Sequence, residues 1–126
     1  MITTTFNKDV LDFSAHGEFV FTFGNVVIKI DYTIDEEGFV WIADVKYERH
    51  TLVQKLEKLL DGDKFSLTTM NGNLSFVNNN NGLVSLKLES NHSYHGFRTE
   101  ATCDLQEFVQ QFKYSLDNLF QQFEHL

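Results

Sequence analysis

The sequence predicts one α+β domain over residues 1–126, with a single antiparallel sheet of about seven to eight strands and two helices on one face of it. Three observations support this prediction. Apolar and polar residues alternate through most of the chain, the apolar period becomes helical at Thr51, and it becomes helical again after Asp104. A chain of 126 residues suits one hydrophobic core, and a hydrophobic content of 42% excludes a disordered acidic protein.

The expected strands lie on both sides of the first helix. The clearest one runs from Ile28 to Ile34, where apolar residues alternate strictly with polar ones. This pattern is typical of a strand with one buried and one exposed face. The dipeptides Gly24-Asn25 and Asn71-Gly72 predict tight turns. The other expected strands cover residues 10–15, 18–23, 39–47, 65–69, 74–76, 84–88 and 97–103.

Two helices are expected. Apolar residues from Leu52 to Leu60 follow helical spacing, and Asp61-Gly62 ends this short central helix. The longer C-terminal helix starts after Asp104, a natural N-cap that is followed by Glu107 three positions later. A continuous apolar stripe must pack against a large surface, so both helices are expected on one sheet face. The stripe consists of Leu105, Phe108, Val109, Phe112, Leu116, Leu119, Phe120 and Phe123.

Cysteine content and the N-terminal residues favour a soluble cytoplasmic protein. Cys103 is the single cysteine, so no intrachain disulfide can form, as is usual in a reducing compartment. The N-terminal residues lack the basic stretch and apolar run of a secretory signal. The most apolar uncharged segment, residues 19–28, is too short for a membrane-spanning helix, which needs roughly 20 residues.

The negative charge is concentrated toward the N-terminus. The formal net charge is -8, and residues 1–48 contribute -6 of it through nine acidic and three basic side chains. So few basic residues exclude nucleic-acid binding driven by bulk charge. The acidic residues of the N-terminal strands have two interpretations, a solubility surface or a docking surface for a basic partner. They are Asp31, Asp35, Glu36, Glu37, Asp44 and Glu48.

No group of residues predicts catalysis, a metal ion or a cofactor. His92-x-x-His95 has a spacing found in zinc sites, but no further ligand motif accompanies it, so solvated loop histidines are the preferred interpretation. Cys103 lies in the apolar row of a strand, which favours a buried thiol over a nucleophile. A small hydrolase would need His50, His92 and His95 to converge in one cleft. The chain is therefore expected not to be an enzyme.

Several segments follow one another in a recognisable order. An alternating strand and an acidic turn precede the Trp-bearing strand Phe39-Val40-Trp41-Ile42, and the next helix ends in Leu59-Leu60-Asp61-Gly62. A β-meander with Asn-Gly and Asn-rich turns leads to a closing helix that opens with Asp104-Leu105-Gln106-Glu107-Phe108-Val109. From about residue 28 to 120, this order resembles the small immunity proteins of bacterial polymorphic toxin systems, including contact-dependent growth inhibition.

The resemblance implies a cytoplasmic antidote that binds the C-terminal toxin domain of its own system and covers its active site. Such toxins are often nucleases, whose clefts are basic because they hold phosphates. The carboxylates from Asp31 to Glu37 are then expected to occupy that positive field. Exposed aromatic side chains would anchor the complex, with Tyr32, Tyr47 and Tyr94 as candidates.

A second function stays open on the sequence. The chain is alternatively a non-enzymatic domain that holds a small molecule in an apolar pocket between the sheet and the C-terminal helix. Neither function includes direct contact with nucleic acid or with a membrane.

Overall fold

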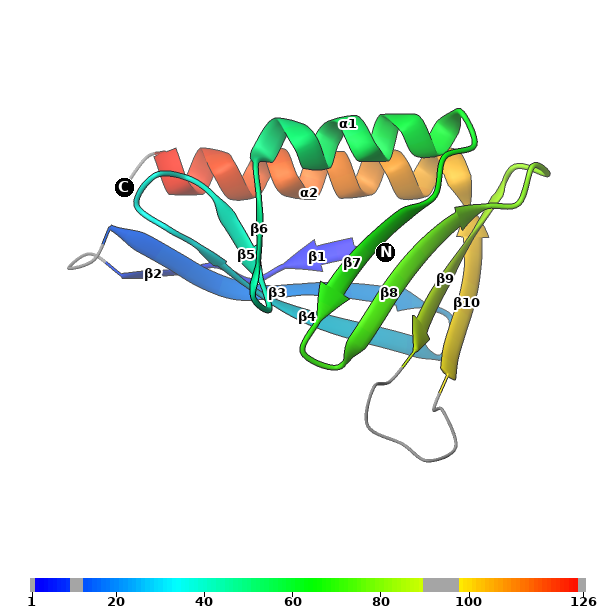
Figure 1. Ribbon diagram of the computed structural model, residues 1–126, viewed down its shortest axis with the longest axis horizontal. Coiled ribbons are helices and arrows are strands. Elements are labelled where there is room, and N and C mark those ends of the chain that lie inside the picture. Colours follow the sequence, from blue (N-terminus) through cyan, green and yellow to red (C-terminus); the bar gives the residue numbers. More distant parts are fainter. Residues whose placement is uncertain (1, 10–12, 90–97, 125–126) are drawn as a thin grey trace.

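A computed structural model describes residues 2–9, 13–89 and 98–124. The fold is α+β, with two antiparallel sheets and two helices (Figure 1). In chain order the elements are β1 (Ile2–Thr4), β2 (Asn7–Asp9), β3 (Ser14–Phe23), β4 (Val26–Ile34), β5 (Val40–Ile42), β6 (Val45–Tyr47), α1 (Arg49–Leu60), β7 (Phe65–Thr69), β8 (Gly72–Asn78), β9 (Leu83–Glu89), β10 (Arg98–Asp104) and α2 (Leu105–Glu124).

The strands form two sheets, which differs from the single sheet predicted. The first sheet has the order β1-β3-β4-β5-β6, with β2 also paired to β3, and the second has the order β10-β9-β8-β7. Helix α1 separates the two groups along the chain. In the described part of the chain no ladder joins β6 to β7. A side-chain contact joins these two strands, because the backbone N–H of Thr68 in β7 donates a hydrogen bond to the hydroxyl of Tyr47 in β6.

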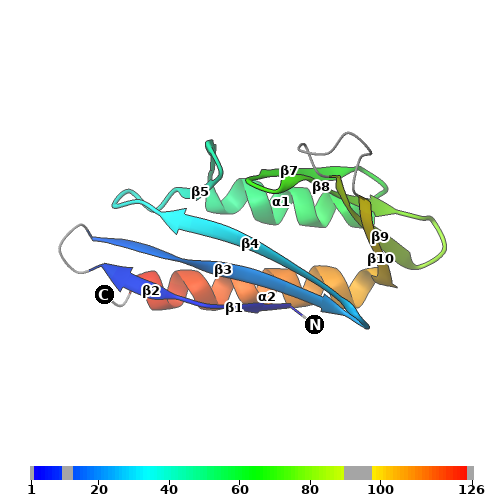
Figure 2. The same ribbon diagram turned by 90° about the horizontal axis from the view of Figure 1, so that it is seen from below.

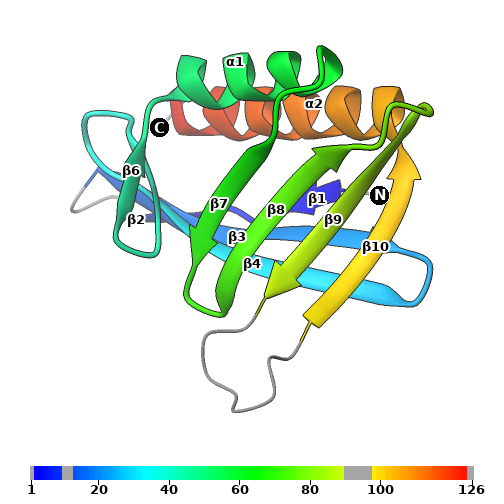
Figure 3. The same cartoon turned by 45° about the vertical axis from the view of Figure 1, so that its right-hand side comes forward.

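Both helices lie on the same side of the sheets and run antiparallel beside each other (Figures 1 and 2). Helix α1 contacts β7 and β8 of the second sheet, whereas α2 contacts β1 of the first sheet and both β9 and β10 of the second. The strands of the two sheets cross at a steep angle (Figure 3). Across the described ranges, neither helix is long and apolar enough to cross a membrane.

Phenylalanine rings join α2 to both sheets. The Phe112 ring lies 5.3 Å from Phe21 of the first sheet and 6.2 Å from Phe76 of the second. The Phe108 ring contacts the same two residues at 6.4 and 5.2 Å. All four rings are at most 1% exposed, so α2 holds together two sheets that no backbone ladder joins among the described residues.

The predicted helices are confirmed with small changes at their ends. Helix α1 starts at Arg49, two residues before the predicted start at Thr51, and Gly62 follows its end with a φ of +102°. Asp104 caps α2 as predicted, since its Oδ1 accepts a hydrogen bond of 2.8 Å from the backbone N–H of Glu107.

Two predicted strand boundaries are wrong. Residues 39–47 form the hairpin of β5 and β6, whose turn places Ala43 at a φ of +54°. An apolar alternation that continues through a two-residue turn looks like one strand, which explains the error. The Asn71-Gly72 hairpin exists, but Thr69 pairs with Gly72, so the turn residues are Met70 and Asn71.

Other predictions fall partly outside the described residues. His92, Tyr94 and His95 lie there, and so do residues 10–12 of the weak strand predicted over 10–15. Cys103, which is predicted to be buried, packs against the core but is only half-buried, and burial raises the pKa of its thiol to about 11.

The edge of the first sheet contains a tight backbone contact at Thr5. The backbone N–H of Thr5 donates to the Glu18 carbonyl at 2.9 Å, and the Tyr32 hydroxyl donates to the Thr5 carbonyl at 2.6 Å. Gly17 makes this approach possible, because a Cβ there would overlap the Thr5 carbonyl oxygen and lie 2.8 Å from the Tyr32 hydroxyl oxygen.

We expect Gly17→Ala to lower the free energy of unfolding by about 2–3 kcal/mol, because the added methyl group has to displace backbone. The matched control is Gly24→Ala, where nothing lies within 4 Å of the added Cβ and only a φ of +59° is strained, at a cost of about 1 kcal/mol. Urea unfolding measures both changes. A Gly17→Ala loss no larger than that of Gly24→Ala would contradict the tight contact.

Tyr32 is expected to lower the free energy of unfolding as the pH rises above 10. Burial raises the pKa of Tyr32 well above its ordinary value of 10.0. Above pH 10 the unfolded chain loses this proton while the folded chain keeps it, so stability present below pH 10 is lost as the pH rises. Tyr32→Phe should lower stability by about 1–2 kcal/mol at neutral pH, since it leaves the Thr5 carbonyl without its donor.

The pH series separates the two effects of Tyr32→Phe. Its free energy of unfolding should fall less steeply above pH 10 than that of the wild type. Tyr114→Phe, which changes a ring that is 74% exposed, should keep the wild-type slope. An unchanged slope in Tyr32→Phe would show that its hydroxyl is not held protonated by the fold.

Candidate interaction surface

Strands β3 and β4 have one buried face and one open face. The buried rows contain large apolar side chains such as Phe21 and Ile30, which point toward the helices. Figure 2 shows the opposite side of this sheet without a helix in front of it. We call this side the outer face, and its residues in the two strands are His16, Glu18, Val20 and Thr22 of β3 and Val27, Lys29, Asp31 and Thr33 of β4.

Of the six acidic residues predicted to form a docking surface, Glu48 is the N-cap of α1, and the other five lie in three places. Asp31 is exposed on the outer face. Asp35, Glu36 and Glu37 form the β4–β5 turn, and Asp44 is exposed in the β5–β6 turn. Because β5 runs antiparallel to β4, the turn with Asp44 lies back toward the middle of β4 and away from the β4–β5 turn.

Asp35 stabilises the turn in which it lies. Its Oδ1 accepts hydrogen bonds of 3.0 Å from the backbone N–H groups of Glu37 and Phe39, and its Oδ2 accepts one of 2.8 Å from Trp41 Nε1. Partial burial acts to raise the pKa of Asp35, but these hydrogen bonds outweigh it and hold the pKa below the ordinary value. Both oxygens are engaged within the chain, so the turn offers a partner mainly its two glutamates.

Sequence reasoning missed Glu18, which lies directly opposite Asp31 in the ladder of β3 and β4. Like charges at directly opposed positions destabilise a sheet. Among the described residues, no ion pair involves either carboxylate. The pairing of Glu18 with Asp31 could have been predicted from the turn at Gly24-Asn25. A two-residue turn pairs Phe23 with Val26, and counting back along both strands from that pair places Glu18 opposite Asp31.

Trp41 adds an exposed aromatic ring beside the carboxylates. Its side chain is 36% exposed and pairs with Thr33 of β4, two residues after Asp31 on the same face. The hydrogen bond to Asp35 fixes the indole in one orientation. Two opposed carboxylates beside a fixed indole can bind a lysine or arginine side chain through charge and through the aromatic face.

Two of the three aromatic residues predicted as anchors are buried, and Tyr94 lies outside the described residues. Tyr32 is 2% exposed and Tyr47 is 8% exposed, so neither ring is available to a partner. Both lie in the buried rows of their strands. The alternation in the sequence separates the two faces of a strand, but it did not show that these tyrosines belong to the buried face. Trp41 replaces them as the exposed aromatic side chain of this surface.

The described residues do not assemble a metal site. No group of three or more His, Cys, Asp or Glu side chains among them could hold a metal ion. His50 is exposed and its Nε2 lies 3.1 Å from Glu48 Oε2, while His16 lies on the outer face.

The space between the first sheet and α2 is occupied by side chains. Rings of Phe19 and Phe112 lie 5.8 Å apart there, next to the Phe21–Phe112 pair at 5.3 Å. This packing gives no support to the predicted small-molecule pocket. A hollow of about 530 Å³ lies elsewhere, between the outward surfaces of α1 and α2.

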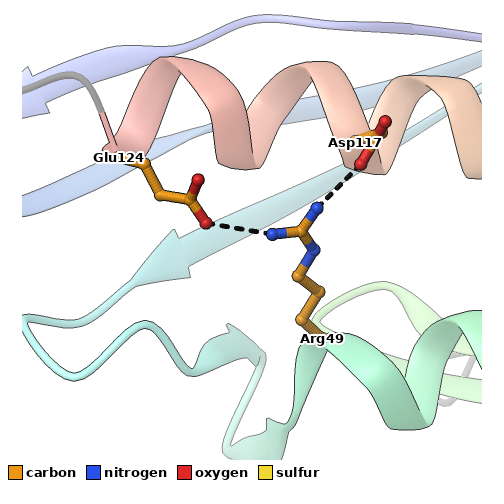
Figure 4. Close-up of polar contacts among 3 residues, drawn as sticks. All are labelled: Arg49, Asp117 and Glu124. Carbon is orange, nitrogen blue, oxygen red and sulfur yellow. Dashed lines mark hydrogen bonds and ion pairs between the residues drawn. The ribbon is translucent and has the colours of Figure 1, made fainter.

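The charged residues of this interhelical hollow are paired with one another. Arg49 of α1 binds Asp117 at 2.7 Å and Glu124 at 3.0 Å, both from α2 (Figure 4). Lys113 of α2 binds Glu57 of α1 at 3.0 Å. These ion pairs connect the two helices, so the cations of this hollow are already neutralised within the chain.

Comparisons of the chain with protein-family models, with curated proteins and with solved structures find no match.

We expect neutralising either member of the opposed pair to stabilise the protein. Glu18→Gln and Asp31→Asn should each raise the free energy of unfolding by about 0.2–1 kcal/mol at low salt, because repulsion between the two carboxylates is lost. The gain should shrink at high salt, where exposed charges are screened. Urea unfolding at two salt concentrations measures both effects.

Glu100→Gln is the matched control for this prediction. Glu100 is exposed in β10 and lies opposite Lys87 of β9, so its ladder position faces an opposite charge. Its neutralisation should leave stability unchanged or lower it. If Glu18→Gln behaves like Glu100→Gln, the two carboxylates on the outer face do not repel each other measurably.

Proposed function

We propose that the chain binds a basic protein partner, through its outer face and its β4–β5 turn, and performs no catalysis of its own. The observation that carries this proposal is the opposed pair of Glu18 and Asp31, which forms no ion pair among the described residues and lies on the same side of the sheet as the exposed ring of Trp41. A partner's lysine or arginine would supply that cation and remove the repulsion between the two carboxylates.

The partner that fits this chemistry is a bacterial toxin domain with a basic active site, such as a nuclease. Its cleft is positive because it holds phosphates, and the glutamates of the β4–β5 turn would extend the negative surface that meets it. We place the complex in the cytoplasm, where the antidote would cover the active site. The resemblance to immunity proteins is the second support for this partner.

The size of the surface is compatible with a specific complex. A standard interface covers about 800 Å² on each partner, which is about a tenth of the 7486 Å² of accessible surface of the chain. Affinity in such complexes is concentrated in buried aromatic and arginine anchors, whereas charges at the rim mainly set the association rate. We therefore assign the anchor to Trp41 and the steering role to the carboxylates.

Association kinetics test the proposal. We expect a large secreted protein to be encoded immediately upstream of the gene for this chain, and the partner in the assay is the C-terminal fragment of that protein. The double variant Glu18→Gln/Asp31→Asn should associate about tenfold more slowly at low salt, because two of the steering charges are removed. Stopped-flow fluorescence measures this rate, and Trp41→Phe should act mainly on the dissociation rate.

The control variant is Asp61→Asn/Glu100→Gln, which changes the net charge equally with exposed residues outside the outer face. It should associate at nearly the wild-type rate. Since the test variant is expected to be more stable than the wild type, slower binding cannot be attributed to unfolding. Equal rates for both double variants would remove the outer face from the interface, and a gene neighbourhood without a large secreted protein would contradict the toxin as partner.

A further inference from the structure

A second hollow collects positive charge on this acidic chain. Its volume is about 220 Å³, and it lies between the last two turns of α1 and the segment that leads into β7. In Figure 1 this end of α1 is on the right, whereas the β4–β5 turn is at the left end of the molecule. The hollow is lined by Lys55, Lys58, Asp63, Lys64, Phe65 and Ser66.

The three lysines of this hollow have no carboxylate partner within the described part of the chain. The ion pairs there involve Arg49, His50 and Lys113, and none of them reaches Lys55, Lys58 or Lys64. Lys55 and Lys58 are three positions apart on α1, where like charges repel. Asp63 lines the same hollow without an ion pair to any lysine, so the lining carries a net charge of two positive units.

We infer that this hollow binds a phosphoryl group, as free phosphate or as the phosphate of a small molecule. Three lysines from two segments line this hollow together with Ser66, and their ammonium groups are donors suited to a tetrahedral dianion. Lys55 Nζ lies 5.8 Å from the ring centroids of Tyr47 and Phe65, and the Ser66 hydroxyl oxygen lies 3.4 Å from that of Ser75, and neither group is bound by a carboxylate among the described residues. Two surplus positive charges match the charge of a phosphate monoester. The volume is below the range of about 300–1,000 Å³ that holds a drug-sized ligand, which favours one anionic group.

The contrast with the interhelical hollow supports this inference. That hollow also contains cations, but Arg49 and Lys113 are bound there by carboxylates of the opposite helix at 2.7 and 3.0 Å. Its positive charge is therefore used to connect α1 and α2. The lysines near β7 connect no elements by ion pairs, and their charge is available to a ligand. The inference does not depend on the proposed function, because it concerns other residues at the other end of the molecule.

The experiment is an NMR titration of the ¹⁵N-labelled full chain with inorganic phosphate, phosphoserine, sulfate and acetate at constant ionic strength. Phosphate and sulfate should shift the backbone amide signals of residues 64–66 in a saturable way, with a dissociation constant on the order of millimolar. Acetate, a planar monoanion, should produce much smaller shifts. Tighter binding of phosphoserine than of phosphate would identify a small-molecule monoester as the ligand, and equal binding would identify free phosphate.

Two charge-matched variants decide whether the lysines are responsible. Lys58→Gln/Lys64→Gln should weaken phosphate binding at least about tenfold, because it removes two of the three ammonium donors. Lys29→Gln/Lys87→Gln removes the same charge from strands outside the hollow and should bind as the wild type does. Equal responses to acetate and phosphate, shifts spread over the whole chain, or equal losses in both variants would each overturn the inference.

Discussion

The two sheets stay together because one helix packs its phenylalanines against both. Phe108 and Phe112 of α2 contact Phe21 in the first sheet and Phe76 in the second, with ring centroids 5.2 to 6.4 Å apart. Burial of each such side chain contributes about 1.5–3 kcal/mol. Since the phenylalanine and isoleucine side chains at Phe19, Phe21, Ile28, Ile30 and Ile34 point inward from the β3–β4 hairpin, its outer face is left to residues that the core does not select.

The charged residues discussed above are of two kinds, those bound in ion pairs between helices and those that lie near like charges without an ion pair. Arg49 and Lys113 bind carboxylates across α1 and α2, and these exposed pairs hold the helices in place, although each such pair contributes about 1 kcal/mol or less. Glu18 with Asp31, and the three lysines near β7, gather like charges that no residue of the described chain neutralises. Folding gains nothing from the second kind, which is why both proposals of binding are based on it.

Local patterns predicted the helices well, and contacts between distant segments explain where prediction failed. The Asp104 cap and the apolar stripe of α2 are local features, and both are confirmed. The division into two sheets arises because the Tyr47 side chain of β6, and no backbone ladder, bonds to β7 in the described chain. No local sequence pattern shows which of these two contacts forms. The acidic turn was located correctly, but the internal hydrogen bonds of Asp35 appear only when Trp41 is placed beside it. The position of Glu18 opposite Asp31 could have been predicted, because the turn at Gly24-Asn25 fixes the pairing of β3 with β4.

The fold has no means of relieving the repulsion between Glu18 and Asp31 by a change of register. A slip of one residue between β3 and β4 would turn out of the core either Phe19 and Phe21 of β3 or the isoleucines of β4. Relief then requires either another residue at one of the two positions or a nearby cation, and Lys29 on the same face forms no ion pair with either carboxylate. Both positions are exposed or half-exposed and tolerate neutral side chains sterically, so the core does not require two carboxylates there. The proposed function supplies a reason for placing them opposite each other, since a lysine or arginine of the partner would relieve the repulsion. Trp41, whose indole is held by Asp35, lies on the same side of the sheet opposite Thr33.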